Sequence, residues 1–159
     1  QSFMGAKRRI KRYAGNWDLK QYYIMIEKRY FTLGEAEEIL PKVKALLEKL
    51  LRVQIKSMAH DQIQIDYDDE FLESAEAIRN ELVESKHCYE FFKILHELTK
   101  LGVFIKDPSI GLVDFYSKLG DKDIFLCYKY PEKTISFWHG INDGFLSRKS
   151  VELLKENSS

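Results

Sequence analysis

The sequence predicts an α+β fold in which two long antiparallel helices are followed by a small antiparallel β-meander of three to four strands. Two observations lead to this prediction. Apolar residues recur with helical spacing from about residue 33 to about residue 101, and after Gly102 the spacing changes to the alternation typical of strands. Because a sheet of this size needs a covering layer to be stable, we expect the helices to pack on one of its faces.

The first helix is predicted over about residues 33 to 57. Thr32 and Glu35 match the capping-box pattern, in which the first residue caps the helix and the acid three positions later reaches back to its amide. The apolar positions that follow have helical spacing. They are Ala36, Ile39, Leu40, Val43, Leu46, Leu47, Leu50 and Val53. Residues 62–67 then alternate between polar and apolar, which is the pattern of a short strand.

The second helix is predicted over about residues 69 to 101, with Gly102 placed as its C-terminal cap. The strands of the meander follow, separated by turns that contain proline or glycine. They are predicted at 103–106, 111–116, 123–130 and 134–139. From Ser150 to the end, the sequence indicates a short polar helix or a frayed tail.

Charge divides the chain into a basic N-terminal extension, residues 1–24, and a single α+β domain, residues 25–159. The extension holds six of the 25 basic side chains and one of the 25 acidic ones, so 19 basic and 24 acidic side chains remain for the domain. Two interpretations of the extension are open: an arm for nucleic acid or a membrane surface, or an added segment that is not native. A nucleic-acid partner is expected only if the extension is native.

The cysteine content and the hydropathy pattern point to a cytoplasmic protein. Cys88 and Cys127 are the only cysteines, and neither has a neighbour at a metal-binding spacing, so we expect buried, reduced thiols. No apolar run approaches the roughly 18 residues of a membrane span, and no segment has the pattern of a signal peptide. No membrane partner is therefore expected.

Polar side chains gather where the predicted strands end, and these positions form the candidate ligand-binding site. The candidates are Lys106, Asp107, Asp114, Trp138, His139, Asp143 and Arg148. Alternation along the last strand places His139 on one face with Ile135 and Phe137. A histidine at the end of such an apolar row either pairs with a buried carboxylate such as Asp114 or faces the mouth of a pocket. The sequence leaves both interpretations open.

The leading functional hypothesis is a module that binds a small ligand or anion at the loop from His139 to Arg148. Arg148 offers a planar guanidinium to a carboxylate or phosphate, and Lys106 adds a second positive charge. Trp138 supplies a flat apolar wall, and the glycines of the loop allow close approach of the backbone.

Two further hypotheses remain. One is a metal-dependent, hydrolase-like enzyme in which His139, Asp143 and Asp114 supply nitrogen and oxygen ligands to a divalent ion. The other is a structural or partner-binding homodimer, because the helices carry apolar residues in excess of what the small sheet covers. The cluster considered for that contact is Cys88, Phe91, Phe92 and Leu95. No cofactor motif is present, and the sequence does not decide whether the protein is an enzyme.

Five segments in this order resemble the uncharacterised family known as domain of unknown function 2203. They are Tyr30–Ala36 with Leu40-Pro41, Gly102–Pro108, Gly111–Phe115, Leu126–Tyr128, and Phe137–His139 continuing through Gly144 and Phe145 to Arg148. The resemblance covers about residues 30 to 148 and implies a fold and motif positions, but no chemistry, since the family has no established activity. In that family an acid usually follows the histidine and a glycine usually precedes the arginine. Here Gly140 and Ser147 stand at those positions, and Asp143 is the candidate replacement for the acid.

Overall fold

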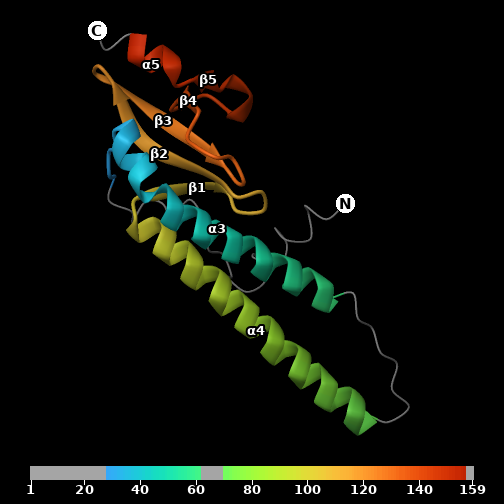
Figure 1. The fold of residues 1–159 in the computed structure, drawn as a ribbon. Helices are drawn as coiled ribbons and strands as arrows, with labels where there is room; N and C mark the ends of the chain where they lie inside the picture. Colours follow the sequence, from blue (N-terminus) through green and yellow to red (C-terminus); the bar gives the residue numbers. More distant parts are fainter. Residues whose placement is uncertain (1–27, 62–69, 157–159) are drawn as a thin grey trace.

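A computed structural model describes residues 28–61 and 70–156 of the chain. Its two long helices are α3, Leu33–Asp61, and α4, Glu70–Lys100, which lie side by side in antiparallel orientation and extend away from the sheet (Figure 1). Both predicted helices are confirmed, and α3 continues four residues beyond its expected end. The basic extension and the candidate strand at residues 62–67 lie outside the described residues.

The capping box at the start of α3 is formed as predicted. Glu35 Oε2 accepts a hydrogen bond from the Thr32 backbone N–H at 2.8 Å, and Thr32 Oγ1 accepts one from the Glu35 N–H at 3.2 Å. These bonds favour the carboxylate form, and the pKa of Glu35 is therefore lowered, with the backbone bond from Thr32 as the largest cause. The α4 helix ends at Lys100 and is followed by Gly102, whose φ of 82° is a backbone conformation that favours glycine.

The sheet has five antiparallel strands in the order β1-β2-β3-β4-β5. Their bounds are β1 Val103–Asp107, β2 Leu112–Leu119, β3 Lys122–Lys129, β4 Phe137–Gly140 and β5 Lys149–Ser150. The prediction of three to four strands was therefore too low, because β5 contributes only two residues and shows no alternation to detect. A short helix, α5 (Glu152–Glu156), follows β5, which is the first of the two alternatives left open for the C-terminal segment.

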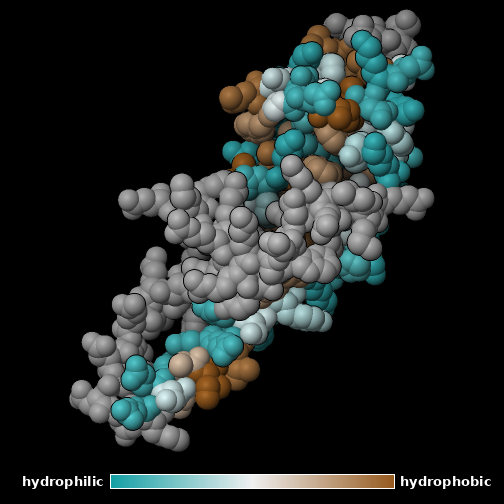
Figure 2. All heavy atoms as spheres, turned by 180° about the vertical axis from the view of Figure 1, so that it is seen from behind, coloured by the Kyte–Doolittle hydropathy of each residue, from teal (hydrophilic) through white to brown (hydrophobic). Residues whose placement is uncertain are grey.

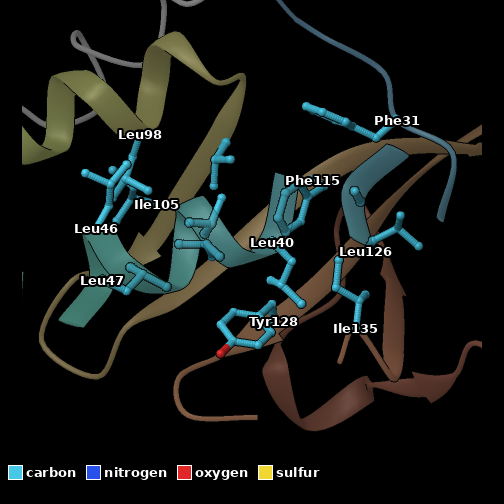
Figure 3. Close-up of a cluster of buried hydrophobic side chains, with 14 of the residues drawn as sticks. Phe31, Leu40, Leu46, Leu47, Leu98, Ile105, Phe115, Leu126, Tyr128 and Ile135 are labelled. Carbon is cyan, nitrogen blue, oxygen red and sulfur yellow. The ribbon is translucent and has the colours of Figure 1, made fainter. Parts of the chain in front are cut away.

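The face of the sheet that packs on α3 and α4 contains the hydrophobic core (Figure 3). Val103, Phe115, Leu126 and Trp138 are aligned across four neighbouring strands, and all four side chains are buried in this core. Helix residues such as Leu40, Leu46, Leu47 and Leu98 fill the space opposite them (Figure 3).

The helix cluster considered for a homodimer contact mostly belongs to this core. Phe91 and Leu95 are 7% and 2% exposed, and Phe92 packs against the core while partly buried. The cluster is therefore not a free surface, and the choice of these residues for a homodimer contact was wrong. The reason is that α3 and α4 bury these side chains against each other as well as against the sheet.

The opposite side of the sheet, which we call the outer face, carries aromatic and polar residues. Its members are Phe104, Asp114, Tyr116, Phe125, Cys127, Phe137 and His139, which alternate along the strands with the core residues. Phe125 lies at the centre of several ring contacts: its centroid is 4.6 Å from that of Tyr116 and 5.8 Å from that of Phe104. The candidate polar residues Asp114 and His139 therefore lie in an aromatic setting.

The expected alternation from Ile135 to His139 does not hold over its whole length. Phe137 and His139 share the outer face, but Ile135 is 2% exposed within the core (Figure 3). The reason is that β4 begins only at Phe137, so the strand period does not extend back to Ile135.

Among the described helices, none combines the length and apolar character needed to cross a membrane.

Candidate metal centre

Three neighbouring strands each place one polar side chain in a single buried cluster on the outer face. Asp114 of β2 is aligned with Cys127 of β3, and His139 of β4 is aligned with Phe125, two residues from Cys127 on the same face. Asp114, Cys127 and His139 are 0%, 1% and 1% exposed. One carboxylate oxygen, the thiol sulfur and one ring nitrogen all lie within 4.8 Å of one another. The cluster has the donor set and the compactness of a metal site.

Hydrogen bonds fix the proton on one nitrogen of the His139 ring. Nδ1 lies 2.9 Å from the carbonyl oxygen of Gly140, and Nε2 lies 3.2 Å from Asp114 Oδ1. Since a carbonyl oxygen only accepts hydrogen bonds, Nδ1 carries a proton and donates it. Nε2 is therefore the atom that gains or loses a proton. When Nε2 is protonated, it pairs with the Asp114 carboxylate. When Nε2 is deprotonated, its lone pair points towards Asp114 and Cys127.

Burial and mutual charge shift the pKa values of two members of the cluster. The hydrogen bond to Asp114 is the largest cause that raises the pKa of His139, and it outweighs burial, which opposes the charged form. Burial, followed by the nearby Asp114 carboxylate, raises the pKa of the Cys127 thiol to about 12. The hydrogen bond to Asp114 therefore favours the protonated form of His139, and burial favours the protonated thiol of Cys127.

One oxygen of the Asp114 carboxylate lacks a nitrogen or oxygen donor. Asp114 Oδ2 is buried, and within residues 28–61 and 70–156 no nitrogen or oxygen donor is hydrogen-bonded to it, while the Cys127 thiol is the neighbour that interacts with the carboxylate. A buried carboxylate oxygen without a hydrogen bond is costly, and in native proteins such an atom calls for a specific explanation. The positive charge of a cation bound between Asp114, Cys127 and His139 would offset the cost of this buried, unpaired oxygen.

The raised pKa of His139 predicts how stability changes with pH in metal-free protein. The histidine binds its proton more tightly in the folded state, so its contribution is fully present below the unfolded value of 6.5 and is lost as pH rises through the raised pKa. We expect the free energy of unfolding of wild type to fall relative to that of His139→Gln as pH rises above 6.5. Urea denaturation with chelator at several pH values measures this difference. His96→Gln, at an exposed position on α4, serves as the control and should follow wild type.

Arg148 connects the segment between β4 and β5 to the turn after β3. Its Nη2 donates to both carboxylate oxygens of Glu132, at 2.8 and 3.0 Å. The guanidinium carbon lies 4.1 Å from the ring centroid of Phe137 and 4.6 Å from that of Phe145. Because the guanidinium is already engaged by a carboxylate and two aromatic rings, its geometry favours a structural role over the capture of a free anion.

The remaining predicted site residues lie in separate surroundings. Lys106 is exposed, and its positive charge acts against protonation of His139. Asp107 accepts hydrogen bonds from the N–H and Oγ of Ser109 within its own turn. Trp138 points to the core, and its Nε1 donates to the Ser150 carbonyl. Of the seven candidates, the structure thus brings Asp114 and His139 into direct contact.

Asp143 acts on the loop backbone. Its Oδ2 accepts a hydrogen bond from the Gly140 N–H at 3.1 Å, and a Cβ placed on Gly140 would lie 2.6 Å from the same oxygen. The carboxylate of Asp143 therefore occupies the space beside Gly140 that a side chain at that position would need. As part of this turn, it lies outside the compact group of Asp114, Cys127 and His139.

Cys127 is the member of the cluster that sequence reasoning missed. Its position inside an apolar strand suggested a buried thiol, and it is buried, but the same alternation also places it on the outer face with Phe125. Both cysteines are free thiols. The information that was lacking is the register between β2 and β3, which aligns Cys127 with Asp114.

Comparison with known families places these residues within the span of one family model. A family model described as an uncharacterised conserved protein, DUF2203, matches residues 29–151, which include Asp114, Cys127 and His139. The chain belongs to the DUF2203 family. This confirms the resemblance drawn from the motifs, over nearly the same residues. Neither the curated proteins nor the solved structures yield a significant match to the chain.

Proposed function

We propose that this DUF2203 domain binds one divalent transition-metal ion, best matched by Zn²⁺, through Asp114, Cys127 and His139. The observation that carries the proposal is the compact arrangement of a carboxylate, a thiol and an imidazole, with all ligand atoms within 4.8 Å, in a buried position. Thiolate and imidazole ligands favour zinc and similar ions over Mg²⁺ and Ca²⁺, which prefer oxygen ligands.

The hydrogen bonding of His139 supports this proposal. A metal-bound histidine usually donates its other ring N–H to a carbonyl or carboxylate, which fixes the tautomer and turns the free lone pair towards the ion. Nδ1 of His139 makes such a bond to the Gly140 carbonyl, so Nε2 is the available ligand atom. The separation of Nε2 and Asp114 Oδ1 is 3.2 Å. Tetrahedral bonds of about 2.0 Å would hold two such atoms roughly 3.3 Å apart.

The burial of the ligands indicates what the ion does. All three side chains are at most 1% exposed, so the bound ion would be buried on the outer face of the sheet rather than open to solvent. It would join β2, β3 and β4 through one ligand from each strand. The proposed role is therefore stabilisation of the fold by metal binding, since an ion that binds only the folded state adds its binding free energy to stability.

Calorimetric titration of the chelator-treated full chain with ZnCl₂ tests the proposal. We expect one ion per chain in wild type, and a loss of affinity of at least about a hundredfold in Cys127→Ser, because a thiolate ligand is removed. Cys88→Ser provides the matched control, since Cys88 is the other free thiol and lies on α4. It should bind zinc as wild type does.

Proton release provides a second readout of the same titration. The Cys127 thiol has a pKa raised to about 12, so it must lose its proton when it binds the ion. Repeating the titration in buffers of different ionisation enthalpy should show at least one proton released per ion in wild type and Cys88→Ser. The proposal fails if folded wild type binds no zinc, or if the two cysteine variants bind it equally well.

A further inference from the structure

The N-terminal half of α4, which lies farther from the sheet than the C-terminal half, has a stripe of exposed apolar side chains. Ile78, Leu82 and Tyr89 are 61%, 67% and 69% exposed. None of the α4 side chains at positions 73–90 is buried, whereas Phe91 and several apolar residues after it enter the core. Figure 2 shows apolar side chains gathered near the end of the helical pair that lies farthest from the sheet. This half of the helix therefore contributes little to the core of a single chain.

The spacing of this stripe is that of a coiled-coil seam. Counting from Ala75, the residues recur at intervals of three and four, which are the a and d positions of a heptad. The seam consists of Ala75, Ile78, Leu82, Ser85 and Tyr89, all of which are exposed. We call these five residues the α4 seam. A helix whose seam faces solvent in one chain can bury it against the same seam of another chain.

The charges beside the seam determine how two copies fit. Arg79, Lys86 and Lys93 occupy the e positions, and Glu81 occupies a g position. In a parallel pair, each g residue lies opposite the next e residue of the other helix, which pairs Glu81 with Lys86 of the second copy, twice by symmetry. In an antiparallel pair, e faces e and g faces g, so like charges would meet. The charge pattern therefore favours the parallel orientation.

We propose that α4 forms a parallel, in-register coiled coil with α4 of a second copy of this chain. The contact is isologous, with Leu82 and Ile78 at its centre and two Glu81–Lys86 ion pairs at its rim. The contact uses the part of α4 that extends away from the sheet (Figure 1). It involves none of the proposed metal ligands Asp114, Cys127 and His139. The dimer and the metal site are thus independent, and each can fail without the other.

Sedimentation velocity of the full chain over a range of concentrations tests the dimer. Wild type should sediment as a reversible dimer, and Leu82→Glu should weaken dimerisation by at least about tenfold because it buries two like charges in the seam. Leu82 is exposed in the single chain, so this variant should fold normally, as circular dichroism will verify. Leu146→Glu, at a position that is 98% exposed in the C-terminal loop, is the matched control and should dimerise as wild type does.

Charge exchange tests the orientation. Glu81→Lys and Lys86→Glu should each weaken the parallel dimer, because each places like charges at both rim contacts. An equimolar mixture of the two variants should restore dimerisation, since each contact then joins opposite charges. A wild type that remains monomeric at all concentrations, a dimer that Leu82→Glu leaves intact, or a mixture no stronger than the single variants would each overturn the proposal.

Discussion

His139→Ala should lower the free energy of unfolding of the metal-free protein by about 3–5 kcal/mol. The substitution removes the partner of Asp114 and leaves a carboxylate that is 0% exposed without its charged neighbour. It also opens a cavity on the outer face, where the ring packs 5.5 Å from the centroid of Phe125. Urea denaturation in the presence of chelator, followed by circular dichroism, measures the loss.

A double variant separates the cost of an unpaired charge from that of lost packing. Asp114→Val combined with His139→Leu replaces the pair by apolar side chains of similar size, and such a replacement is often close to neutral. We expect the double variant to be more stable than His139→Ala. If His139→Ala costs less than about 1 kcal/mol, the pair does not have the buried, charged character that the geometry indicates.

Leu47→Ala should destabilise the protein by about 2–5 kcal/mol. Leu47 is 0% exposed on α3 and lies in the core between the helices and the sheet (Figure 3). The loss combines the transfer of the side chain out of the core with the cavity left behind. Denaturant titration of the folded protein measures it.

Leu146→Ala is the control for this core substitution because the chemical change is the same and Leu146 is 98% exposed. Its effect should stay within about 0.5 kcal/mol of wild type. Equal effects at the two positions would contradict the placement of the core between α3 and the sheet.

The elements that the sequence predicted well are those determined by local patterns. The capping box of Thr32 and Glu35 is completed by atoms three residues apart, so the start of α3 can be read from four consecutive residues. The end of α4 is likewise marked by a single residue, Gly102, which adopts a positive φ. In the sheet, alternation and turn residues predicted β1 to β4, while β5 was missed because two residues contain no pattern.

The features that the sequence did not predict depend on register and on contacts between distant segments. Cys127 joins Asp114 only because β2 and β3 pair with one particular alignment, which no local pattern reveals. Arg148 was considered as a ligand for an anion, but its guanidinium pairs with Glu132, which the turn after β3 brings to it. The pairing of His139 with Asp114, one of the two interpretations left open, is the one that the structure shows.

X-ray absorption spectroscopy of the zinc-loaded full chain tests the central claim most directly, because it reports the ligands of the ion. We expect one sulfur ligand at about 2.3 Å and nitrogen or oxygen ligands at about 2.0–2.1 Å in wild type and in Cys88→Ser. The sulfur contribution should vanish in Cys127→Ser. A first shell of nitrogen and oxygen alone in wild type, or a sulfur ligand that persists without Cys127, would show that the ion does not bind at Asp114, Cys127 and His139.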